Sequence, residues 1–110
     1  MSSYSWTYTT WPDAGAAREA AAVLIDERLC ACANILPAMT SVYRWEGRVE
    51  TASEAVMILK TSPERKAALR DRIAQLHPYD EPCILSLSID DEGSSAAFLD
   101  WIRTETCPDP

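Results

Sequence analysis

The sequence contains few glycines, a single histidine and a minority of basic side chains. Only three glycines occur among the 110 residues, which leaves little material for a glycine-rich loop that cradles phosphate. The lone histidine is His77, so one chain offers only one imidazole to a metal ion. Ten basic side chains face 17 acidic ones, a net charge of −7. This balance argues against a nucleic-acid partner and against an anionic membrane surface.

Long apolar runs are missing as well. No stretch approaches the ~20 apolar residues that a membrane-spanning helix requires. The first ten residues, MSSYSWTYTT, lack the basic and apolar regions of an export signal. We therefore expect a cytoplasmic protein, in which thiols stay reduced. No disulfide framework and no C-x-x-C pair is expected from the four cysteines, Cys30, Cys32, Cys83 and Cys107.

The length and composition of the chain indicate one globular domain over residues 1–110. The first third of the chain predicts a strand followed by a helix. Aromatic and β-branched residues predict a strand over 4–11. Asp13, after Pro12, is suited to cap a helix over 14–29. The buried stripe of this helix is expected at Ala17, Ala20, Ala21 and Leu24.

Two long extended segments, 30–46 and 49–61, lie on either side of a predicted turn at Gly47. Pro37 cannot donate a backbone hydrogen bond, which predicts a bulge or an edge there. The second segment is apolar on both faces, as in a buried central strand. The hairpin is longer than a compact sheet needs, and strands that overrun their sheet usually pair with a partner. We therefore expect subunit assembly through this hairpin.

The second half of the chain predicts a helix, a strand and a last helix. Ser62 and Pro63 are typical of a helix start. The helix is expected to end near Leu76, because His77 precedes Pro78 and is disfavoured in the helical region.

The next segment, CILSLSI over 83–89, alternates as a strand does. We expect Cys83, Leu85, Leu87 and Ile89 to point toward the core. Ser94 or Ser95 is expected to cap the last helix, with an inner face of Phe98, Trp101 and Ile102.

The predicted order is β-α-β-β-α-β with an additional C-terminal helix. This order is typical of the α+β class and of the ferredoxin-like split βαβ fold. In that fold, two helices cover one face of a four-stranded antiparallel sheet.

Five segments stand out along the chain: YTTWPD, ERLCACANI, SVYRWEG, ILKT and LHPYDEP. In this order and spacing they resemble the CutA family, the divalent-cation tolerance proteins, and the resemblance extends over roughly residues 8 to 103. The resemblance implies a ferredoxin-like subunit and a tight homotrimer, in which hairpin strands of one subunit extend the sheet of the next. It also implies a similarity of architecture to the PII signalling proteins, which bind small effectors in clefts between subunits.

The resemblance implies a role in tolerance of, or response to, copper and other divalent cations. The family's metal-binding cysteine and histidine match Cys32 and His77. A cysteine that some members carry after the first strand is absent, because that region reads TTW. The resemblance implies no established enzymatic activity, and no organic cofactor is expected. A Cys-His dyad would need an orienting group that nothing in the sequence specifies, so we expect a protein that is not an enzyme.

A second interpretation is a PII-like module that binds a small effector and for which metal binding is incidental. Asn34, Trp45, Lys60 and Tyr79 lie near predicted strand ends and loops, where they could hold an anion or a planar ligand in an intersubunit cleft. The alternative for Tyr79 and Trp45 is packing at the subunit interface alone.

Overall fold

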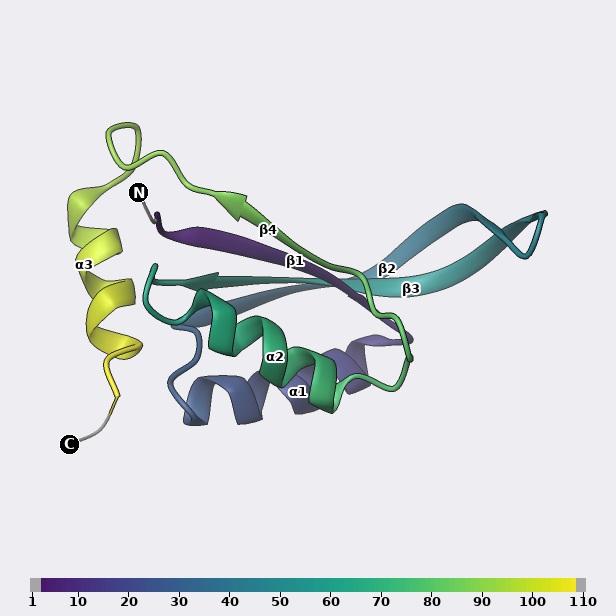
Figure 1. Cartoon of the computed structure of the whole chain (residues 1–110), viewed down its shortest axis with the longest axis horizontal. Coiled ribbons are helices and arrows are strands. Elements are labelled where there is room, and N and C mark those ends of the chain that lie inside the picture. Colours follow the sequence, from purple (N-terminus) through teal and green to yellow (C-terminus); the bar gives the residue numbers. More distant parts are fainter. Residues whose placement is uncertain (1–2, 109–110) are drawn as a thin grey trace.

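The computed structural model describes residues 3–108 and has the predicted order of elements. The order is βαββαβ followed by a C-terminal helix (Figure 1). In chain order the elements are β1 (Ser5–Trp11), α1 (Ala14–Asp26), β2 (Cys32–Trp45), β3 (Arg48–Thr61), α2 (Lys66–Leu76), β4 (Ile84–Ser88) and α3 (Ala96–Glu105).

The four strands form one sheet in the order β2-β3-β1-β4, and all neighbouring pairs are antiparallel. The ferredoxin-like prediction is thereby confirmed. β3 is a central strand with Val56 and Met57 both buried, which confirms the expectation drawn from its two apolar faces. α1 and α2 lie side by side on one face of the sheet, and α3 lies across one end (Figure 1).

α1 begins where the sequence predicts it and ends at Asp26, three residues before the expected end at residue 29. The Asp13 carboxylate accepts a hydrogen bond of 2.8 Å from the backbone N–H of Ala16, which satisfies one of the free donors of the first turn. The predicted stripe is buried and packs into the main core: Ala17, Ala20, Ala21 and Leu24.

Replacing Asp13 with alanine should lower the free energy of unfolding by about 1 kcal/mol, because the Ala16 N–H loses its partner. Asp13→Asn should keep most of the stability, since asparagine caps about as well as aspartate. Urea unfolding followed by circular dichroism measures both. Equal losses in the two variants would mean that the charge of Asp13, and not its cap, stabilises the helix.

The β2–β3 hairpin extends well beyond the rest of the sheet (Figure 1). Its register shifts between Leu36 and Met39, so the bulge expected at Pro37 is confirmed. Gly47 turns the chain with a φ of 79°, in the left-handed region that glycine tolerates best.

The start of α2 differs from the prediction, whereas its end agrees. Residues 63–65 form a turn, closed by a 3.1 Å bond from the Arg65 N–H to the Ser62 carbonyl, and the helix begins at Lys66. The Ser62 hydroxyl does not cap the helix, because Arg65 occupies the N-cap position, and the hydroxyl makes a buried hydrogen bond with Thr106 Oγ1 instead. His77 ends the helix with extended backbone, at ψ 138°, as expected before proline.

β4 turns its leucines the opposite way from the prediction. Leu85 and Leu87 are 59% and 50% exposed, while Ile84 packs against the core. Directly opposed residues of an antiparallel pair share a face, and Leu85 and Leu87 oppose Tyr8 and Trp6. They therefore lie on the face away from α1 and α2, which we call the open face.

α3 is capped by Ser95, whose hydroxyl accepts from the Phe98 N–H at 3.3 Å. Its inner face is Leu99 and Ile102, with Phe98 and Trp101 each more than 40% exposed. The prediction for Ile102 is confirmed, and those for Phe98 and Trp101 are wrong.

Candidate functional site

His77 lies in a buried position between two aromatic rings. Its ring centroid is 4.2 Å from that of Trp11 and 4.9 Å from that of Tyr79, and the residue is only 7% exposed. The helix end that Pro78 imposes directs the side chain back toward β1. His77 therefore joins the loop after α2 to the end of β1.

Both ring nitrogens of His77 have partners. Nε2 lies 2.7 Å from the carbonyl oxygen of Thr10, and Nδ1 accepts a 3.1 Å hydrogen bond from the backbone N–H of Tyr79. A carbonyl oxygen can only accept, so the proton resides on Nε2, and Nδ1 is unprotonated. A metal ion could bind either nitrogen only after one of these two bonds is broken.

Cys32 begins β2 and is partly exposed. It opposes Lys60, which in turn opposes Trp6, so its thiol lies on the open face. Its thiol donates a weak hydrogen bond to the side-chain oxygen Oδ1 of Asn34, with 3.8 Å between Sγ and Oδ1. This thiol is accessible to a soft metal ion.

The fold does not bring Cys32 and His77 together within one chain. Cys32 is level with Trp6 on β1, whereas His77 contacts Thr10. Four residues of strand separate these levels by about 13 Å. Within residues 3–108, no three His, Cys, Asp or Glu side chains form a group that could hold a metal ion. A metal bound by Cys32 would need donors from other subunits or from solvent.

Cys30 and Cys83 are poor thiolate ligands. Burial raises the pKa of the Cys30 thiol to about 12, and the neighbouring Cys32 thiol adds to the effect. Burial also raises the pKa of Cys83. Because metals bind the thiolate, Cys32 is the better placed of these three cysteines.

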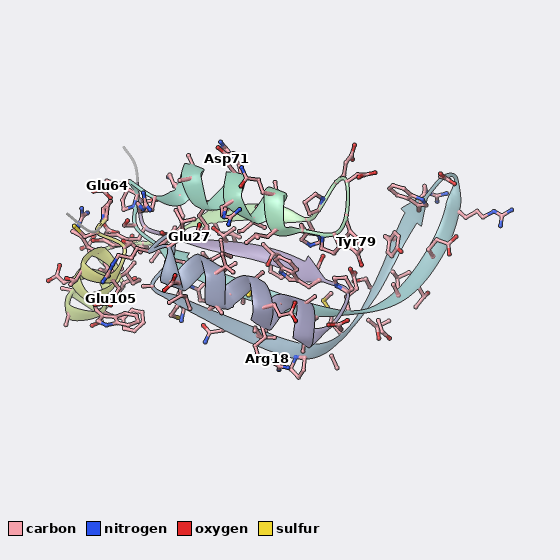
Figure 2. All side chains as sticks on the ribbon, turned by 90° about the horizontal axis from the view of Figure 1, so that it is seen from below. Arg18, Glu27, Glu64, Asp71, Tyr79 and Glu105 are labelled. Carbon is pink, nitrogen blue, oxygen red and sulfur yellow. The ribbon has the colours of Figure 1, made fainter. Side chains whose placement is uncertain are left out.

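The four residues considered for an effector site are spread over the subunit. Asn34 lies on the open face beside Cys32, and Lys60 places its Nζ 5.5 Å from the ring centroid of Phe98. Trp45 is 58% exposed near the tip of the hairpin. Tyr79 lies in the loop after α2, at the end from which the hairpin projects (Figure 2). They form no common site in one chain.

Glu54 is a site residue that the sequence did not single out. It opposes Met39 immediately after the bulge of β2. Burial raises the pKa of Tyr79, and the negative charge of Glu54 adds to the shift, as do Tyr43 and Asp13. Acidic and phenolic groups therefore gather at the base of the hairpin. In the sequence it is one acidic residue within the second extended segment, and no short motif marks it.

Among residues 3–108, no helix has the length and apolarity needed to cross a membrane.

The family model described as "CutA1 divalent ion tolerance protein" matches residues 5–105. The divalent-cation tolerance protein CutA of Thermus thermophilus is 40% identical over 97 residues, which covers 88% of this chain and 92% of that protein. Human Protein CutA is 35% identical over 104 residues, which covers 94% of this chain, and the chain spans 57% of its length.

Solved structures agree with these matches. CutA from Xylella fastidiosa superimposes with a TM-score of 0.91 at 34% identity, covering 96% of this chain and 100% of that one. The periplasmic divalent cation tolerance protein CutA from Archaeoglobus fulgidus has a TM-score of 0.88 at 37% identity, covering 94% and 98%. The chain therefore belongs to the CutA1 divalent ion tolerance protein family.

Proposed function

We propose that this protein acts in the cell's response to divalent metals as a cytoplasmic homotrimer that binds copper or a similar cation. The match to the CutA1 family over residues 5–105 carries this proposal. Four free cysteines, Cys30, Cys32, Cys83 and Cys107, support a reducing compartment. The Archaeoglobus relative is named periplasmic, so a fractionation experiment on the native host tests the location.

The metal contact is placed on Cys32. Its thiol is partly exposed on the open face, and thiolates favour copper(I) and zinc. His77 is the second candidate ligand from the sequence, and its ring would first have to leave Thr10 or Tyr79. In a trimer, three copies of Cys32 supply donors that one chain lacks.

The trimer is supported by the surface of the subunit. The open face exposes several large apolar side chains: Trp6, Leu36, Leu85 and Leu87. The hairpin exposes Val42, Tyr43, Trp45 and Val49 in addition. Apolar surface of this kind marks an interface, which supports assembly through the hairpin and the open face. The proposal includes no catalytic step.

Cys32→Ser should weaken zinc binding, and copper binding under reducing conditions, at least tenfold, because the thiolate donor is removed. Cys107→Ser is the matched control, since Cys107 is also exposed but lies after α3. Competition titration against a chromophoric chelator measures both affinities. Equal losses in the two variants would indicate non-specific thiol binding, and an unchanged affinity in Cys32→Ser would place the metal elsewhere.

A further inference from the structure

A cavity of about 340 Å³ opens at the base of the hairpin, where the bulge of β2 passes the start of α1. Its walls include the apolar side chains of Pro12, Pro37 and Met39. Met39 is held in place by a 3.7 Å contact from the Tyr8 hydroxyl to its sulfur. The hollow is open to solvent, and its volume is far larger than a single metal ion needs.

The charged groups of this cavity are both carboxylates, Asp13 and Glu54. None of the described residues that line it is basic. One oxygen of Asp13 accepts from the Ala16 N–H, which leaves its second oxygen available. The ion pairs between described residues use Glu27, Glu64, Asp71 and Glu105, so Glu54 has no cationic partner among them.

A carboxylate that is only partly exposed is stabilised by a cation that approaches it. Glu54 is partly buried, and the hydroxyl of Thr40 lies in the same lining. Burial and the charges of Glu54 and Asp13 also raise the pKa of Tyr79 beside this region, which indicates a negative potential there. With a chain charge of −7, the surrounding field attracts cations and repels anions.

We propose that this cavity binds a small organic cation, an amine on a short aliphatic chain. The ammonium group pairs with Glu54 and with the free oxygen of Asp13. The methylene groups lie against Pro12, Pro37 and Met39. An inorganic cation fits this cavity less well. Hydrated magnesium has no apolar surface to place against Pro12, Pro37 and Met39. Within residues 3–108, no three Asp, Glu, Cys or His side chains form a group that could hold a metal ion.

The site is separate from the proposed metal contact. Cys32 opposes Lys60, six residues along β3 from Glu54, a distance of about 20 Å along an extended strand. Binding of an amine and binding of a metal at Cys32 can therefore be lost independently.

Isothermal titration of the full-length protein with putrescine tests the proposal, with 1,4-butanediol as an uncharged probe of similar length and magnesium chloride as an inorganic dication. Putrescine should bind in a saturable manner, and butanediol should not bind. Glu54→Gln should weaken putrescine at least tenfold. Asp13→Asn, which retains the helix cap, should weaken it several-fold. Glu92→Gln removes the same charge from an exposed position and should change the affinity less than twofold.

Three outcomes would overturn the proposal. One is an absence of saturable putrescine binding at millimolar concentration. Another is an equal loss in Glu54→Gln and Glu92→Gln, which would mean diffuse attraction to an acidic protein. The third is magnesium binding that depends on Glu54 and excludes putrescine, which would make the cavity a site for hard cations.

Discussion

Replacing His77 with alanine is expected to lower the free energy of unfolding by about 3 kcal/mol, because one buried and one partly buried backbone group lose their partners. The carbonyl of Thr10 and the N–H of Tyr79 both bond to the imidazole. The contact with the Trp11 ring, at 4.2 Å between centroids, is lost as well and adds to the effect. Urea unfolding at a fixed protein concentration measures the change, since the stability of an oligomer depends on concentration.

His77→Gln provides the control for this experiment. Glutamine can still supply a donor toward Thr10 and an acceptor toward Tyr79, so its loss of stability should be about 1 kcal/mol. Neither variant should change zinc affinity as strongly as Cys32→Ser. An alanine variant with native stability and a tenfold weaker metal affinity would show that the imidazole serves mainly as a ligand.

The same residue shows what a sequence can and cannot predict about a site. The sequence indicates His77 as a possible ligand because it is the only histidine and matches the metal-binding histidine of the CutA family. The helix end before Pro78 followed from local sterics, and the structure confirms it. The contact with Thr10, 67 positions away in the chain, depends on the packing of α2 against β1, for which the sequence has no local signal.

Other features that depend only on neighbouring residues also agree with their predictions. The cap at Asp13, the stripe ending at Leu24 and the bulge near Pro37 each depend on a few neighbouring residues. Ser62 shows the limit of such signals. It has the features of a helix cap, but its hydroxyl accepts a hydrogen bond from Thr106, 44 residues away, and the helix begins later.

Glu54 was missed because its importance is created by the fold alone. On its own it is one acidic residue in an extended segment. Only the strand register places it opposite Met39, and only the loop before α1 brings Asp13 to the same cavity. A pairing of distant residues of this kind is not encoded in any short motif.

The error at β4 concerns direction and not pattern. The alternation of 83–89 correctly indicated a strand with one apolar face, but alternation does not say which face the helices cover. Register with Tyr8 and Trp6 turns Leu85 and Leu87 to the open face. An apolar surface that the subunit's own helices leave exposed is what a subunit interface requires, so the exposed Leu85 and Leu87 support the proposed assembly.

The double variant Leu85→Asp/Leu87→Asp should therefore abolish assembly. Light scattering should give the mass of three chains for the native protein and of one chain for the variant. Two carboxylates on an interface that buries both leucines would lose their hydration without gaining partners. The subunit should keep its fold, because both positions are at least half exposed within one chain and the helix-covered core contains neither of them.

Ser86→Asp is the matched control, since Ser86 lies on the same strand between the two leucines and faces the other side of the sheet. It adds a carboxylate to β4 without placing it on the open face, so the assembly should survive. Circular dichroism should show native secondary structure for all variants. A native protein that is monomeric in dilute solution would contradict the account of the open face and the hairpin. Dissociation of Ser86→Asp to the same extent would instead assign the effect to added charge, because the two faces of β4 would then respond alike.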